Sequence, residues 1–286
     1  MSSQINKDSI ITLTLFLMLI VSFYFIGYWL IYRLGRATPL MLSAGAAALL
    51  TCVIRKRSIG LIGWHWGEWK YQRLSYLLPL LIIFFAHLLI WSLGLAEWYN
   101  VGFLQDLKSD YNLNEWSDVQ VLVFHFLISS TISFLLLLPS VLGEEIAWRG
   151  FLVPELANFM SFTGVALTSG LAWAMWHWPL IILGLSGNDQ TPLYYQLTCF
   201  TVFLVSISFI LTYLRLKTGS LWTAVIFHMS INLFLQKVFL PLTAQGSNSV
   251  WFIDETGAVL AIVSFVFAVI YWRKRSEVFD YRLSSR

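Results

Sequence analysis

Residues 133–150 read "SFLLLLPSVLGEEIAWRG", an apolar run that leads directly into two adjacent carboxylates and an arginine. The chain around this stretch is 58% hydrophobic and only 12% charged, whereas soluble domains carry roughly 25% charged residues. Its 286 residues are therefore better counted in membrane crossings, each of which needs about 20 residues. We predict an all-α, polytopic membrane protein that forms a single membrane domain over residues 1–286.

Hydropathy divides the chain into eight apolar segments, which we interpret as transmembrane helices. They cover residues 10–32, 39–54, 75–96, 120–146, 164–185, 196–214, 219–240 and 257–272. Between the second and the third lies the basic, tryptophan-rich stretch "RKRSIGLIGWHWGEWKYQR". This composition is typical of a segment that lies in the headgroup region.

Basic residues predict the orientation of the chain, because cytoplasmic loops are enriched in lysine and arginine. Clusters of them follow the second, sixth and eighth segments, at Arg55, Lys56, Arg57, Lys70, Arg73, Arg215, Lys217, Arg273, Lys274 and Arg275. Arg33 and Arg36 in the first connection contradict this scheme, but three later loops outweigh them. We predict that both termini are cytoplasmic and, if the protein is bacterial, that it lies in the plasma membrane.

The charges that set this orientation also bear on the partners of the protein. The net charge is only +3, and the basic residues sit in short clusters beside apolar segments. We therefore interpret the basic residues as topology determinants and not as a surface that binds nucleic acid. We expect the lipid bilayer, and no nucleic acid, among the partners.

Glu144, Glu145 and Arg149 are expected at the cytoplasmic end of the fourth crossing. Ionisable groups at membrane depth are costly and usually face a bundle interior or an aqueous cavity. Glu145 and Arg149 are four residues apart, on one helix face, and can form an ion pair. Glu144 is turned by about 100° from its neighbour, which leaves it as the free carboxylate. The simpler alternative is that all three are interfacial charges at a helix end.

Two later crossings carry the other polar candidates. His177 lies in "LAWAMWHWPL" of the fifth, with Trp173 one turn earlier on the same face. His228 and Asn232 lie four residues apart in "GSLWTAVIFHMSINLF" of the seventh and should point into the bundle. Taken singly, each is compatible with a hydrogen-bonded packing role.

Together these residues make a set suited to amide hydrolysis. Glu144 and His177 can hold and deprotonate a water molecule, while His228 and Asn232 can donate hydrogen bonds to a developing oxyanion. This chemistry needs no serine or cysteine nucleophile. The sequence also has no Cys-x-x-Cys or His-Glu-x-x-His motif, so we expect no metal and no cofactor.

The three motifs resemble the CPBP family (CAAX protease and bacteriocin-processing, also called Abi) of intramembrane proteases. The family pattern is Glu-Glu-x-x-x-Arg, then Phe-x-x-x-His, then His-x-x-x-Asn or Asp. Here Trp173 stands where the pattern has phenylalanine, and the resemblance covers about residues 120–240. It implies a catalytic core over that range, with Glu145, Arg149 and Trp173 in supporting roles. It also implies a glutamate-dependent endopeptidase whose substrate is a lipidated or membrane-associated peptide or protein.

Two other functions remain open from the sequence. Two carboxylates and two histidines are also potential zinc ligands, which would make the enzyme metal-dependent. Alternatively, the protein is not an enzyme, and its polar residues serve transport, a scaffold or an immunity function. Transporters commonly contain internal repeats, and we find none in this sequence.

Overall fold

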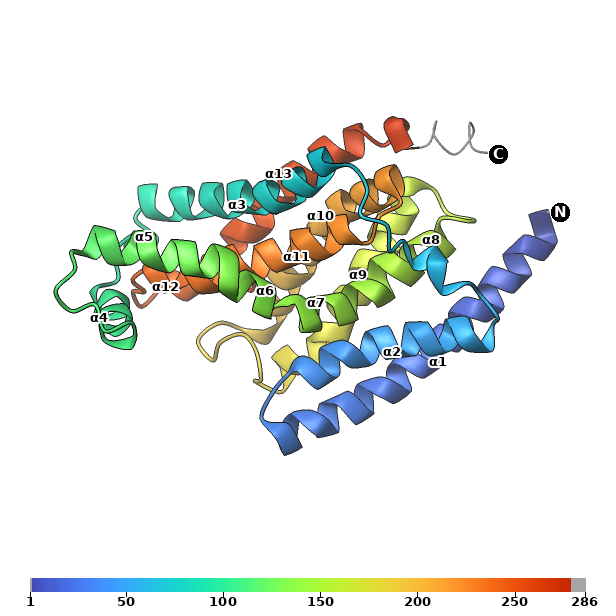
Figure 1. Ribbon diagram of the computed structural model, residues 1–286, viewed down its shortest axis with the longest axis horizontal. Coiled ribbons are helices and arrows are strands. Elements are labelled where there is room, and N and C mark those ends of the chain that lie inside the picture. The colour runs from blue at the N-terminus through green and yellow to red at the C-terminus, as the bar shows by residue number, and fades with distance from the viewer. Residues whose placement is uncertain (1, 279–286) are drawn as a thin grey trace.

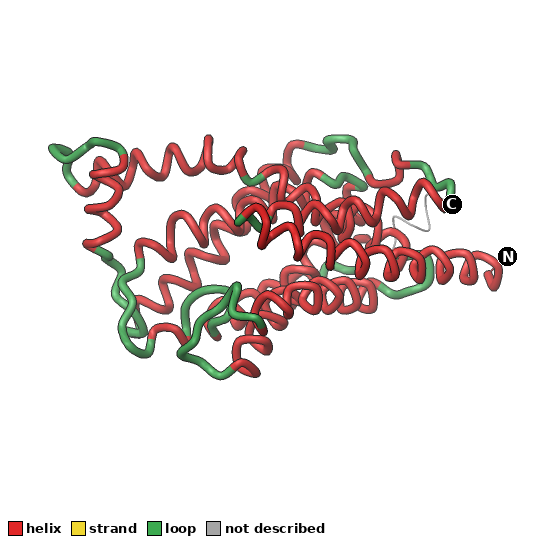
Figure 2. Tube along the Cα trace, turned by 90° about the horizontal axis from the view of Figure 1, so that it is seen from below, coloured by secondary structure: helices red, strands yellow, loops and turns green. Residues whose placement is uncertain are grey.

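The computed structural model describes the backbone of residues 2–278 and the side chains of residues 7–278, and within this range the chain is helical, without strands (Figure 2). The α-helices are α1 (Ser2–Leu34), α2 (Thr38–Ile54), α3 (Trp69–Ser92), α4 (Val101–Asp110), α5 (Asp118–Ile128), α6 (Phe134–Leu136), α7 (Leu138–Glu145), α8 (Val153–Leu156), α9 (Phe162–Ile182), α10 (Leu193–Thr218), α11 (Trp222–Leu233), α12 (Leu240–Leu242) and α13 (Ala258–Arg273). The other helical segments are the 3-10 turns η1 (Ile59–Ile62) and η5 (Ser249–Trp251) and the π-helical segments η2 (Ser129–Ser133), η3 (Ile146–Leu152) and η4 (Phe234–Phe239).

All eight predicted apolar segments are helical, which confirms the predicted class of polytopic, all-α membrane protein. Six helical runs in the described part of the chain have the length and composition of a membrane span: Lys7–Leu34, Trp69–Ser92, Asp118–Leu136, Phe162–Ile182, Leu193–Thr218 and Trp222–Leu242. The apolar helices α2 and α13 are shorter, with 17 and 16 residues. Helix α3 begins six residues earlier than predicted and takes in the end of the tryptophan-rich stretch.

Helix α10 is the centre of the bundle and packs against α9, α11 and α13 (Figure 1). Of its apolar window, 67% is buried inside the molecule, against 22% for α1. Helix α1 pairs with α2 along one side, whereas α3 packs against α11 and α13 on another. The apolar side chains of α1 are therefore left for lipid, while α10 supplies the internal surface on which the other helices are ordered.

Two glycines allow α2 and α7 to touch backbone to backbone. A Cβ atom at Gly45 would lie 2.5 Å from the carbonyl oxygen of Gly143, and one at Gly143 would lie 2.8 Å from the Cα of Leu42. Small residues are enriched where transmembrane helices approach this closely. Because Gly143 immediately precedes Glu144, the contact fixes the position of the two adjacent carboxylates.

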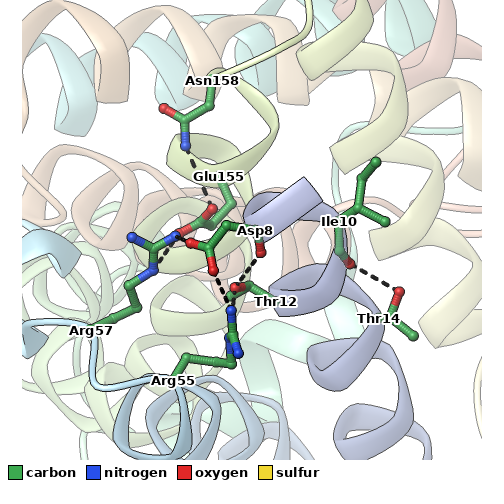
Figure 3. Close-up of polar contacts among 8 residues, drawn as sticks. All are labelled: Asp8, Ile10, Thr12, Thr14, Arg55, Arg57, Glu155 and Asn158. Atoms are coloured by element: carbon green, nitrogen blue, oxygen red, sulfur yellow. Dashed lines mark hydrogen bonds and ion pairs between the residues drawn. The ribbon is translucent and has the colours of Figure 1, made fainter. Parts of the chain in front are cut away.

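A polar cluster joins the start of α1 to the end of α2 and to α8 (Figure 3). Asp8 accepts hydrogen bonds from Arg55 and, at 2.6 Å, from Arg57. The Nε atom of Arg57 lies 3.8 Å from a carboxylate oxygen of Glu155. Exposed ion pairs of this kind contribute about 0–1 kcal/mol each, so the cluster sets the arrangement of these helix ends more than their stability.

The helical structure that carries the Glu144–Arg149 motif extends beyond the fourth predicted segment, residues 120–146. Helical structure continues through η3 and α8 to Leu156, and every residue of 143–153 is buried. Gly150 and Pro154 weaken helix propensity there, but the burial of this segment outweighs them. The charges therefore lie inside the bundle, and not at an exposed helix end.

Candidate active site

Glu145 is a fully buried carboxylate that joins two helical runs. Its Oε1 atom accepts hydrogen bonds from Nη1 of Arg149 at 2.8 Å and from Nδ1 of His228 at 2.9 Å. Both side chains of the Glu145–Arg149 pair are 0% exposed. The i, i+4 ion pair expected from the sequence is therefore present, and it also positions a histidine of α11.

Glu144 faces a different set of partners. Its Oε2 atom accepts a 2.7 Å hydrogen bond from the indole Nε1 of Trp173 and lies 3.8 Å from Nε2 of His177. The Nδ1 atom of His177 lies 3.1 Å from the carbonyl oxygen of Trp173. Because a carbonyl only accepts, Nδ1 carries a hydrogen, and Nε2 of His177 is the atom turned towards Glu144.

The extended fourth run explains how Glu144 and His177 reach the same depth. Glu144 precedes the end of α8 by 12 residues and His177 follows the start of α9 by 15. At a rise of 1.5 Å per residue these separations are about 18 Å and about 22 Å. Since α8 and α9 are joined by a short turn, the two side chains meet near one level of an antiparallel hairpin.

His228 lies on α11, and one of its two ring nitrogens is already hydrogen-bonded. Its Nδ1 atom bonds Glu145, and its ring centroid lies 5.1 Å from that of Trp173 in an edge-on arrangement. The second nitrogen, Nε2, is left to act on other groups. Asn232 lies one turn later on the same helix and is half-buried. The structure thus brings Glu144, His177 and His228 together around Trp173, whereas Asn232 forms no hydrogen bond to any of the three.

Two side chains that the sequence analysis did not single out support this group. Nη2 of Arg149 donates a 3.1 Å hydrogen bond to Ser208 of α10. Arg215 donates from Nε to the backbone carbonyl of Arg149 at 2.8 Å and from Nη2 to those of Leu61 and Ile62. Arg215 follows the sixth predicted segment and was interpreted as a topology determinant, and no sequence signal distinguished it from the other basic residues in such positions.

A third carboxylate, Glu255, lies in the loop before α13. Nε2 of Gln236 lies 3.4 Å from its Oε1 atom, and Gln236 continues the helix face that carries His228. Burial, followed by the charge of Asp254, raises the pKa of Glu255 to about 7. The charges of His228 and Glu144 also act on Glu255. The sequence analysis used this residue only as an acidic loop charge.

In the part of the chain with described side chains, no group of three or more histidine, cysteine, aspartate or glutamate residues has an arrangement that could hold a metal ion. Glu145 already binds Arg149 and His228, and a cation beside Arg149 would be repelled by its guanidinium.

Comparison with known proteins gives a family model whose match covers this site and one curated relative. Residues 126–234 match the family model of the type II CAAX prenyl endopeptidase, Rce1-like. The chain is also 30% identical over 146 residues to the protein named CAAX prenyl protease 2 from Methanococcus maripaludis. That alignment covers 50% of this chain and 49% of the relative, so the chain spans about half the length of this curated relative. The segment that carries Glu144, Glu145, Arg149, His177 and His228 is therefore similar to the type II CAAX prenyl endopeptidase family.

Proposed function

We propose that the protein is a metal-independent intramembrane endopeptidase that uses Glu144 and His177 to activate water. The observation that carries this proposal is the 3.8 Å separation between Oε2 of Glu144 and Nε2 of His177. One water molecule can bond to both atoms, since each bond needs about 2.8 Å between heavy atoms. No covalent enzyme intermediate is required.

In the proposed reaction, Glu144 accepts a proton from the bound water as the oxygen attacks the peptide carbonyl. The oxyanion that forms is stabilised by Nε2 of His228 and the side-chain amide of Asn232. Glu145 supports His228 in this role, because a carboxylate at Nδ1 stabilises an imidazolium ring that then donates from Nε2. The proton passes from Glu144 to the leaving nitrogen as the C–N bond breaks, which yields a carboxylic acid and an amine.

The substrate that we propose is a lipidated or membrane-associated peptide or protein. The support is the location of the site, which lies in a bundle of helices with the length and composition of membrane spans. The names of the matching family and relative refer to prenylated CAAX substrates. A lipid-modified peptide is therefore the first substrate to assay.

The experiment compares purified wild-type protein with Glu144→Gln in proteoliposomes that contain a prenylated CAAX peptide. Mass spectrometry identifies the cleaved bond. We expect Glu144→Gln and His177→Ala to abolish cleavage, while Glu115→Gln, an exchange at an exposed loop residue, leaves it unchanged. Wild-type cleavage by Glu144→Gln would rule out the mechanism. Metal analysis and chelator treatment of the same samples test metal independence.

The native substrate needs a separate search in cells. Membrane peptidomes of cells with the wild-type protein and with Glu144→Gln are compared by their peptide termini. A terminus that depends on Glu144 identifies both the substrate and the bond. If none differs while the purified protein cleaves the prenylated peptide, the activity stands and the native substrate lies outside the sampled set.

A further inference from the structure

Trp173 is the side chain at which the parts of the candidate site meet. It is 2% exposed and is among the largest fully buried side chains of the described chain. Its indole N–H donates to Glu144, its carbonyl oxygen accepts from His177, and its ring lies edge-on to His228. The guanidinium carbon of Arg149 lies 4.0 Å from the ring centroid. One residue therefore contacts four polar residues of the site.

The contact to Glu144 is a property of tryptophan and not of an aromatic ring in general. The motif that this segment resembles has phenylalanine at this position, and phenylalanine has no donor. The 2.7 Å bond between Nε1 of Trp173 and Oε2 of Glu144 is within the range of a charge-assisted hydrogen bond. It fixes the carboxylate on the side of the ring that faces His177.

Neighbouring side chains also fix the position of the Trp173 indole ring. Arg149 covers one region of the indole, at a distance that allows a cation–π interaction. Arg149 is held in turn by Glu145 and Ser208. The N–H therefore points at Glu144 because the ring has little freedom to turn elsewhere.

We propose that Trp173 is a positioning residue that holds the Glu144 carboxylate against His177 through its indole N–H. This inference rests on the proposed function. Removal of the hydrogen bond releases a carboxylate that must be oriented when water is deprotonated. The loss should appear in kcat, and KM should stay within about twofold, because the substrate does not contact the bond that is lost.

The test replaces Trp173 with benzothienylalanine, which keeps the shape of the ring and has sulfur in place of N–H. We expect kcat to fall roughly tenfold to a hundredfold, as for the loss of a hydrogen bond to a charged group. Trp173→Phe should show at least the same loss. The matched control is Trp178→benzothienylalanine, which removes a 3.0 Å hydrogen bond from the same helix to Thr201 of α10.

A second measurement does not depend on activity. The indole N–H resonance of Trp173, assigned by its loss in Trp173→Phe, should shift in Glu144→Gln and stay in place in Glu115→Gln. Thermal unfolding in detergent checks that each variant is folded.

The inference is overturned if Trp173→benzothienylalanine keeps wild-type kcat while Glu144→Gln is inactive, or if the resonance does not respond to Glu144→Gln. Wild-type cleavage by Glu144→Gln would instead refute the proposed function. The two failures are therefore distinguishable.

Discussion

Replacement of Arg149 by methionine removes a buried guanidinium and keeps an unbranched side chain. Three interactions are lost: the 2.8 Å ion pair with Glu145, the 3.1 Å hydrogen bond to Ser208 and the cation–π contact with Trp173. Glu145 then remains at 0% exposure with His228 as its partner. Breaking a buried pair in this way costs about 3–5 kcal/mol, because the remaining charge is left without compensation.

The cost should depend on Glu145, which a double-variant cycle can show. Glu145→Gln removes the charge that Arg149 would otherwise leave unpaired. The double variant should therefore be more stable than the sum of the two single effects predicts, by at least about 1 kcal/mol. The free energy of unfolding is measured by reversible denaturation in mixed micelles, with tryptophan fluorescence as the signal.

Arg57→Met provides the matched control. Arg57 forms a 2.6 Å ion pair with Asp8, but the side chain of Asp8 is 48% exposed. We expect a loss of no more than about 1 kcal/mol, as for other solvent-exposed pairs. The reasoning fails if Arg149→Met costs as little as Arg57→Met, or if the effects at Glu145 and Arg149 are additive.

Three further predictions follow from other parts of the structure. Gly45→Val should lower the melting temperature and abolish cleavage, because its side chain would meet the carbonyl of Gly143; Gly246→Val, at a site with no neighbour within 4 Å, should do neither. The folded-state pKa of Glu255 is raised from 4.5 to about 7, chiefly by burial. Below pH 4.5 the carboxyl group of Glu255 is protonated in both the folded and the unfolded protein, so its burial costs no stability. As the pH rises from 4.5 through 7, ionisation of Glu255 favours the unfolded protein and the stability falls. Melting temperature should fall over that window in the wild type and change less in Glu255→Gln, and identical profiles would contradict the assignment. A cysteine placed at Ser58 should react with an impermeant maleimide only in opened cells, and labelling in intact cells would reverse the predicted orientation.

The fold was accessible from sequence because hydropathy marks each apolar helix without reference to its neighbours. The helix limits were less accessible, as the fourth run shows. It was predicted to end near residue 146 and continues to Leu156. Hydropathy placed the end of the segment there, whereas the packing that keeps residues 143–153 buried is a property of the whole bundle. The π-helical segment η3 adds a further change of register that no single-helix pattern predicts.

In the site, helix periodicity predicted contacts along one helix and not contacts between helices. The Glu145–Arg149 pair followed from a spacing of four residues. The bond from His228 to Glu145 joins residues 83 positions apart, and its existence depends on how deeply α11 sits beside α7. The sequence therefore identified which polar residues face inwards, but it assigned Glu145 only to Arg149.

The different partners of Glu144 and Glu145 follow from helix periodicity, which the sequence gives, together with contacts between helices, which only the structure gives. Neighbouring residues on a helix point about 100° apart, so Glu145 faces Arg149 and His228 while Glu144 faces Trp173 and His177. The expectation that Glu144 is simply free needs correction, because Trp173 binds its Oε2 atom. A carboxylate without such a bond would rotate among several orientations, and only some of them would hold water against His177. The tryptophan that departs from the family motif is thus the residue through which this chain limits Glu144 to one orientation.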